Sequence, residues 1–271
     1  MALLDYTRRA MLAAGTATAI ALSAISVTAQ TPDDVLVVGQ IAEPKALDPA
    51  AVTAVNDFRI LMNLYDGLVR YKDGTLEVEP ALATSWNINN DGTEYTFSLR
   101  QGVKFHDGSD FNADAVKFNF DRMLDEAHPY HNTGPFPLSF FFSAIVSVDV
   151  LDPMTVKFTL NAPYAPFLSN LAYPTGLIVS PDAVAKHGTD FGRNPSGTGA
   201  FKFGEWRSNE AVVVEANSSH WEGAPKLQAV VFRPITDANT RTAEMLAGGI
   251  DMMVEVPPVA LSKFQGDGYT V

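Results

Sequence analysis

The chain has 271 residues, a formal net charge of −12 and no cysteine. A surface this acidic repels nucleic-acid phosphates and anionic lipid headgroups, so binding to nucleic acid or to a membrane surface is not expected. The lack of cysteine excludes disulfides, thiol nucleophiles and cysteine metal ligands.

Residues 1–29 have the pattern of an export signal. Arg8 and Arg9 precede an uncharged run that ends in a small-residue cleavage pattern at residues 27–29. Residues 7–12 resemble a twin-arginine signal, and an ordinary Sec signal and a retained membrane anchor are the open alternatives. No cysteine follows the signal, which excludes a lipid-anchored form. We expect a mature protein of roughly 240 residues outside the cytoplasmic membrane, forming one large or two small domains.

A strand and a helix are predicted next. Residues 35–39 form a continuous apolar run of strand length, and the two prolines in residues 43–49 force the residue before each of them out of the helical region. A helix is then predicted from a cap at Asn56 or Asp57. The residues of this helix expected in the core are Phe58, Leu61, Met62 and Tyr65.

Four Asp-Gly dipeptides lie between residues 66 and 108. They lack the alternating acidic spacing of an EF-hand, so they predict tight turns and not a calcium loop. Residues 94–100 alternate between apolar and polar side chains, which predicts a half-buried strand paired with residues 86–88. Asn112 is placed to cap the helix that follows.

The middle of the chain is rich in aromatic residues and hairpin patterns. Residues 126–142 are irregular, and Pro129 separates His128 from His131, which disfavours a helical metal site there. Residues 145–150 and 155–160 predict a second hairpin. Further predicted elements are a helix over 167–172, a strand over 177–180 and a helix from Pro181 to about His187.

Residues 194–203 contain Gly-Thr-Gly, but a phosphate-binding loop requires a helix after its glycines and a strand follows here. A helix is predicted from the cap at Asp237 to Ala247, followed by a strand over 250–254. The sequence has no phosphate-loop motif and no nucleophile-elbow motif, and no two acids are spaced as an acid–base pair. We therefore expect no enzymatic activity, no cofactor and no metal site.

Several spaced motifs carry a family resemblance. The chain resembles the extracellular solute-binding proteins of peptide ABC transporters, the dipeptide- and oligopeptide-binding type of family 5, over about residues 35–256. The motifs are Pro80-Ala81-Leu82-Ala83, Ser85-Trp86, Asp91-Gly92, Tyr95-Thr96-Phe97, Val103-Lys104-Phe105-His106-Asp107-Gly108, Ala113-Asp114-Ala115-Val116 and Gly197-Thr198-Gly199. Ala200 stands where the family usually has proline, and serines replace residues of a later turn.

The resemblance implies a mixed α/β clamp of the periplasmic binding protein type. One lobe is expected from residues 31–58 and 190–256, with a subsidiary domain, residues 59–189, inserted between them. Family members are about twice as long, so residues 257–271 are expected to start a second lobe that this chain lacks. The fragment is therefore expected to bind peptide very weakly or not at all.

The resemblance also implies a function. A periplasmic protein of this family holds a di- or oligopeptide between two lobes and delivers it to a membrane permease powered by a separate ATPase; we expect a monomer. The ligand-binding residues carried over are Thr53, Ala54, Val55, Tyr130, Val254 and Glu255. Nickel chelates, haem, glutathione, opines and oligosaccharides are alternative ligands within the family, and an exported hydrolase is the alternative of a different class.

Overall fold

The computed structural model describes residues 32–265 and 268–271. The predicted export signal therefore lies outside the described residues. No helix among the described residues combines the length and the apolar run that crossing a bilayer requires.

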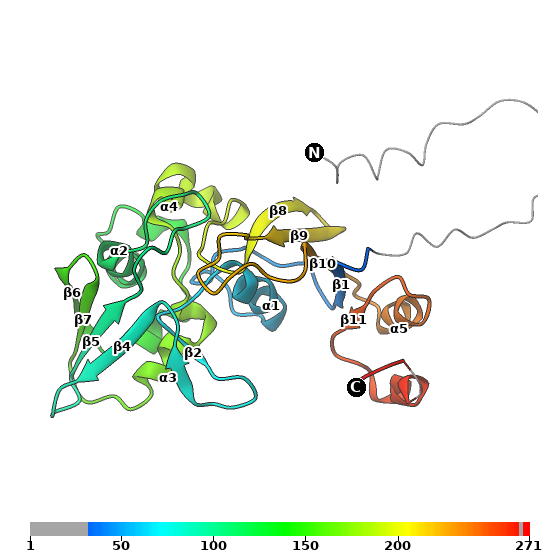
Figure 1. Ribbon diagram of the computed structural model, residues 1–271, viewed down its shortest axis with the longest axis horizontal. Coiled ribbons are helices and arrows are strands. Elements are labelled where there is room, and N and C mark those ends of the chain that lie inside the picture. The colour runs from blue at the N-terminus through cyan, green and yellow to red at the C-terminus, as the bar shows by residue number, and fades with distance from the viewer. Residues whose placement is uncertain (1–31, 266–267) are drawn as a thin grey trace, which may run out of the picture. The chain divides into compact units, whose positions relative to one another are not determined.

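A five-stranded sheet joins the two ends of the described chain (Figure 1). Its order is β11 (Met252–Met253), β1 (Val35–Gln40), β10 (Ala229–Pro234), β9 (Ala211–Ala216) and β8 (Phe201–Arg207). β1 runs parallel to both β10 and β11, whereas β9 and β8 are antiparallel. The two segments predicted to form one lobe thus share a sheet; the domain boundaries themselves stay a prediction.

Helix α1 (Val55–Leu64) packs Phe58, Ile60, Leu61 and Leu64 into the core of this sheet. The Gly-Thr-Gly segment packs directly against the C-terminal end of α1. A Cβ on Gly197 would collide with the carbonyl oxygen of Leu64, and a Cβ on Gly199 would collide with that of Asn63. Glycine is needed here for close backbone packing. Helix α5 (Ala238–Leu246) connects β10 to β11 and is capped by Asp237, as predicted.

A second core surrounds a four-stranded antiparallel sheet. Its order is β4 (Ala83–Ile88), β5 (Glu94–Leu99), β7 (Thr155–Leu160) and β6 (Ile145–Asp152). Both predicted hairpins are confirmed, with Tyr95, Phe97 and Leu99 buried. Helix α2 (Ala113–Leu124) packs on β6 and β7, and its cap Asn112 accepts a hydrogen bond from the Ala115 N–H.

Smaller elements complete the described chain. A two-stranded sheet joins β2 (Val69–Tyr71) to β3 (Val78–Pro80). The predicted helices α3 (Phe167–Ala172) and α4 (Pro181–His187) are confirmed. The 3₁₀ turns are η2 (His131–Thr133), η3 (Ser139–Phe142), η4 (Pro174–Gly176), η5 (Gly188–Arg193) and η6 (Pro258–Phe264).

Some local predictions were wrong. α1 is capped at Ala54 without a side-chain bond, so Asn56 and Asp57 lie inside its first turn, where the Asn56 amide donates to Glu43 O and to Asp57 Oδ1. Met62 is 65% exposed and not in the core. The last strand is shorter than predicted, Met252–Met253. Residues 177–180 form no strand, because the Asn119 side chain takes both backbone groups of Val179.

Candidate functional site

The candidate site lies where three parallel strands end. β1, β10 and β11 run in the same direction, so their carboxyl ends, at Gln40, Pro234 and Met253, meet at one edge of the sheet. In open α/β sheets the crevice outside the carboxyl ends of the strands is the usual place for a ligand.

Val254 and Glu255 follow β11 directly at this edge. The Val254 N–H donates to Gly39 O at 3.1 Å, which continues the pairing with β1, and the Val254 side chain packs against the core on the α1 side. Glu255 has a φ of 56°, a left-handed conformation that is unusual for a residue with a long side chain. It turns its carboxylate to Arg59 on α1, with 3.4 Å between Oε1 and Nη2.

Thr53, Ala54 and Val55 lie at the start of α1. Ala54 is extended and caps the helix, and Val55 is 59% exposed. Arg59 lies one turn further along the same helix, so its pairing with Glu255 connects this end of α1 to the end of β11. The structure thus places three of the six predicted residues at the start of α1 and two at the end of β11, and the Arg59–Glu255 pair joins these two elements. Their role as ligand contacts stays a prediction.

Tyr130 lies on a loop that packs against the turn preceding Thr53. Its ring is half-buried and packs on Phe118, with 5.7 Å between ring centroids. A Cβ on Gly134, further along the loop, would lie 3.2 Å from the Ala51 Cβ, so loop and turn are in close contact. The ring of Tyr130 is therefore held by packing, and nothing in its surroundings identifies a ligand.

Two polar residues at this edge were missed by the sequence analysis. Arg59 Nη1 is buried without a hydrogen-bond partner among the described residues. Gln40 is fully buried, and neither of its amide atoms has such a partner either. The only available sequence signals were a glutamine that ends an apolar run and an arginine inside an apolar helix pattern.

Asp57, on the first turn of α1, is a buried carboxylate. Its Oδ1 accepts from the Lys45 N–H at 3.0 Å, while Oδ2 is without a hydrogen-bond partner in the described part of the chain. Burial raises the pKa of Asp57, although the backbone hydrogen bonds from Lys45 and Ala54 oppose the shift. Among the described residues, Gln40, Arg59 and Asp57 thus each have a buried polar atom without a hydrogen-bond partner.

An apolar hollow of about 280 Å³ adjoins the same edge. Met252, Met253 and Val256, which flank Val254 and Glu255, line one part of it. Met245 of α5 and Phe264 and Tyr269 of the C-terminal segment line the rest. A site at the end of β11 would thus have an apolar pocket beside its charged pair.

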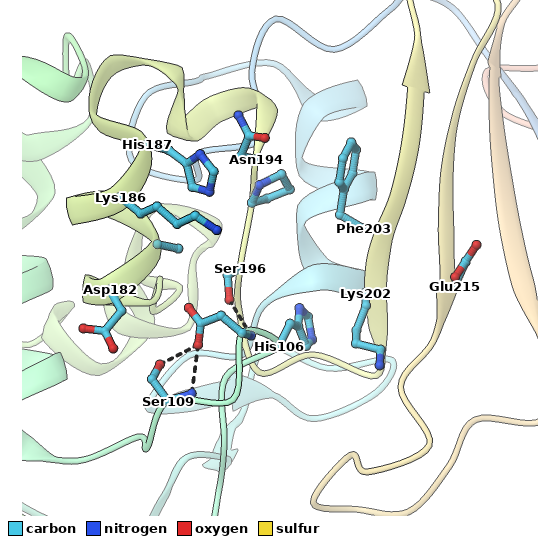
Figure 2. A pocket seen from close by; sticks show the side chains of 13 residues that line it. His106, Ser109, Asp182, Lys186, His187, Asn194, Ser196, Lys202, Phe203 and Glu215 are labelled. Carbon is cyan, nitrogen blue, oxygen red and sulfur yellow. Dashed lines mark hydrogen bonds between the residues drawn. The ribbon is translucent and has the colours of Figure 1, made fainter.

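A cavity of about 710 Å³ lies elsewhere and is lined by none of the six predicted residues (Figure 2). It is open and polar, between α4, the turn at residues 106–109 and β8. Asp107 in its wall is fully engaged, because it accepts hydrogen bonds from Ser109 and Ser180. The cavity is lined by two lysines, Lys186 and Lys202, and by three carboxylates, Asp107, Asp182 and Glu215, so charges of both signs face it.

His106 in that cavity wall has a structural role. Its Nε2 lies 3.0 Å from Gly199 O, and its Nδ1 accepts from the Gly197 N–H at 3.3 Å. Burial lowers the pKa of His106 to about 4, so the ring is neutral near pH 7. A neutral ring with both nitrogens occupied holds the Gly-Thr-Gly segment and is not poised for proton transfer.

Comparison with known proteins identifies the family. Residues 77–271 match the model of the bacterial extracellular solute-binding proteins, family 5 (middle region). The chain belongs to this family. Its members bind small solutes, work with ABC permeases and are periplasmic or extracellular; they are not enzymes.

Curated relatives support the family assignment. The glutathione-binding protein GsiB of Pectobacterium atrosepticum is 35% identical over 258 residues, which cover 95% of this chain and 48% of that protein. GsiB of Salmonella typhimurium is 37% identical over 212 residues, which cover 78% and 40%. This chain therefore spans about half the length of the curated relatives it matches.

Solved structures show the periplasmic binding protein fold. DppA of Helicobacter pylori, in complex with the peptide STSA, matches with a TM-score of 0.79 and 36% identity, over 85% of this chain and 48% of that one. The dipeptide-binding protein of Pseudoalteromonas sp. SM9913, in complex with Met-Leu, gives 0.82 and 29%, over 86% and 50%. NikZ of Campylobacter jejuni, in complex with Ni(L-His), gives 0.78 and 30%, over 88% and 46%.

Among the described residues, no three His, Asp or Glu side chains lie close enough together to hold a metal ion. His128 and His131 turn to other partners: His128 Nδ1 accepts from the Tyr130 N–H, and His131 Nδ1 lies 3.0 Å from Arg122 O.

Proposed function

We propose that the protein is the periplasmic substrate-binding component of an ABC importer and that its solute is a short peptide. The observation that carries the proposal is the site at the carboxyl ends of β1, β10 and β11, where Thr53–Val55 and Val254–Glu255 lie next to a strand edge. An extended peptide can pair its backbone with such an edge, and this pairing tolerates many side chains.

The relatives agree with a peptide solute. GsiB is named for glutathione, a tripeptide, and two of the structural neighbours hold the peptides STSA and Met-Leu. Nickel-histidine and the opines mannopinic and agropinic acid occur in other neighbours, at 29–31% identity. The solute class is therefore the point that the experiment has to decide.

In this proposal the chain supplies one jaw of a clamp. Residues 31–58 and 190–256 form the lobe, residues 59–189 form the inserted domain, and an opposing lobe closes over the solute. The ligand can favour the closed state only through contacts with both lobes. The closed protein then docks on its permease.

Calorimetry tests the solute. Residues 30–271, and a version extended by a second lobe, would be titrated with glutathione, Met-Leu, Ser-Thr-Ser-Ala, Ni(L-His) and mannopinic acid. We expect the extended version to bind one of the three peptides and residues 30–271 to bind it at least about 100-fold more weakly, because half of the contacts are missing. Preference for Ni(L-His) or mannopinic acid would contradict a peptide solute, and equal affinities would contradict the clamp.

A matched pair of variants tests the location. Val55→Trp places a bulky ring at the start of α1, whereas Leu76→Trp places the same ring on the exposed β2–β3 turn, where Leu76 is 84% exposed. We expect the first variant to weaken binding about 10-fold or more and the second to leave it unchanged. Equal affinities for the two variants would show that the solute binds elsewhere.

A further inference from the structure

Arg59 is the cation of the candidate site, and its hydrogen bonding is incomplete. Of its terminal nitrogens, Nη2 meets Glu255 at a long 3.4 Å, and Nη1 is buried with no partner among the described residues. A guanidinium has five N–H donors in a planar fork, and leaving a buried donor unsatisfied is costly. The state that the structure shows therefore leaves Arg59 short of an acceptor.

Glu255 pairs only weakly with Arg59. Its side chain is 48% exposed, and it reaches Arg59 with a single oxygen from a backbone in the left-handed region. An exposed single contact of this kind contributes little, and the unusual φ opposes it. A better acceptor can therefore displace Glu255 at little cost.

Gln40 adds an independent observation on the same side of the sheet. Side chains alternate along β1, so Gln40 points to the same face as Val38, which packs in the core beneath α1. β1 and β11 are paired through Gly39 and Met253, which places Gln40 level with the residue before Glu255. An amide with both atoms unpartnered thus lies at the strand end beside which Arg59 and Glu255 meet.

We propose that Arg59 is the receptor for a carboxylate of the solute and that Glu255 is the internal counter-ion which the carboxylate replaces. A carboxylate accepts two parallel N–H bonds from a guanidinium, which is the arrangement that Arg59 lacks here. This inference rests on the proposed function only in placing the solute at the carboxyl ends of the strands.

The inference makes the free carboxylate of the solute a determinant of specificity. A peptide with a C-terminal carboxylate pairs with Arg59, whereas the corresponding C-terminal amide cannot form a charged pair. Glutathione carries two carboxylates and satisfies the same requirement. Backbone pairing at the strand edge would then supply affinity, and Arg59 would select for an unblocked end.

A ligand-by-variant comparison tests this role. Calorimetry of the protein, extended by a second lobe as above, would compare Met-Leu with Met-Leu amide and glutathione with the form in which both of its carboxylates are amides. We expect Arg59→Gln to weaken the carboxylate ligands about 10- to 100-fold and to leave the amides within about twofold. Arg207→Gln, a change at an arginine that pairs with Glu205 and Glu210, should leave all four unchanged. Equal losses for acid and amide, or no loss, would overturn the inference.

The variant Glu255→Gln should have the opposite effect on the affinity for carboxylate ligands. It removes the competing carboxylate, so we expect the carboxylate ligands to bind about two- to fivefold more tightly while the amides are unaffected. Weaker binding of the carboxylate ligands would show that Glu255 contacts the solute and is not a displaced counter-ion.

A second measurement separates this inference from the proposed function. If no peptide binds, the proposed solute class has failed, and sodium acetate then serves as the probe at constant ionic strength, with chloride as the control. We expect acetate, and not chloride, to shift the ¹⁵N resonance of the Arg59 guanidinium in the wild type, and to shift it at lower concentration in Glu255→Gln. An Arg59 signal that acetate does not move would overturn the inference, whatever the solute is.

Discussion

Arg122 and Asp48 form a buried, two-pronged ion pair. The Arg122 nitrogens Nη1 and Nη2 lie 3.0 and 3.1 Å from the two carboxylate oxygens of Asp48, and both side chains are at most 2% exposed. Asp48 belongs to the turn that leads to Thr53, and Arg122 belongs to α2, which packs on the other sheet. The pair therefore fixes the start of the candidate site to the predicted inserted domain.

Removing one partner of this pair should be strongly destabilising. We expect Arg122→Met to lower the free energy of unfolding by about 3–5 kcal/mol, because it leaves the Asp48 carboxylate buried and uncompensated. Urea denaturation followed by circular dichroism measures the loss.

The double variant Asp48→Asn with Arg122→Met should cost less than the sum of the two single changes, because no buried charge remains. Arg207→Gln, which breaks only exposed pairs, should cost less than about 1 kcal/mol. Strict additivity of the two buried changes would show that the pair is not coupled.

The two glycines of the Gly-Thr-Gly segment should tolerate no side chain. A Cβ at Gly199 would collide with the backbone carbonyl of Asn63, which cannot move away without disturbing α1. We expect Gly199→Ala to cost about 1–3 kcal/mol or more in urea denaturation. Gly204→Ala is the milder control, because its Cβ would lie 3.1 Å from the Glu215 side chain and 3.2 Å from the Val213 carbonyl oxygen, against 2.4 Å from the Asn63 carbonyl oxygen at Gly199. Equal costs for the two variants would refute the packing explanation.

His106 should make the stability depend on pH below neutrality. Burial lowers its pKa from 6.5 to about 4 in the folded state. Between these values the unfolded chain binds a proton that the folded chain does not, so stability falls as the pH falls from 6.5 to 4, by up to about 1.4 kcal/mol per pH unit.

Urea denaturation at pH 4, 5, 6 and 7 measures this slope in the wild type and in His106→Gln. We expect the variant to be less stable at pH 7, because it loses the hydrogen bond to Gly197, and to show a shallower slope. The comparison between the two proteins cancels the titration of groups such as His128, whose pKa burial also lowers. Identical slopes would mean that His106 is protonated without penalty.

Two neighbouring residues of α1 should respond in opposite ways to truncation. Leu61 is fully buried, whereas Met62 is 65% exposed. We expect Leu61→Ala to cost about 2–5 kcal/mol and Met62→Ala to change stability by no more than about 0.5 kcal/mol. Thermal or urea unfolding distinguishes them, and a large loss at Met62 would indicate that this face of the helix is covered in solution.

Local patterns predicted the parts of the fold that depend on neighbouring residues. The hairpin at residues 86–100 and the Asn112 cap follow from alternation and from turn chemistry, and both are confirmed. Residues 177–180 have the same apolar signal, but Asn119, distant in sequence, donates to Val179 O and accepts from Val179 N at 2.8 and 2.9 Å. A side chain thus takes the place of a partner strand, which no local pattern can show.

The candidate site was less accessible from sequence for the same reason. Thr53–Val55 and Val254–Glu255 came from family resemblance, and only the sheet places them at one edge. Arg59 and Gln40 stand out only when their neighbours are known, because an unsatisfied donor is a property of the folded chain. The burial of Met62 was predicted wrongly, because helical spacing does not show which residues at the border of an apolar stripe face the core and which face solvent.

The pairing of β1 has a consequence for the order of assembly. Its two neighbours begin only at Ala229 and Met252, so a chain emerging from the ribosome carries β1 with both edges open until almost all of the lobe has been made. Contacts this distant in sequence form slowly, and the hairpins around β5 and β7, whose partners are close by, can form first. The late closure of this sheet leaves both edges of β1 unpaired during synthesis, and an unpaired strand edge is a template for pairing with another chain.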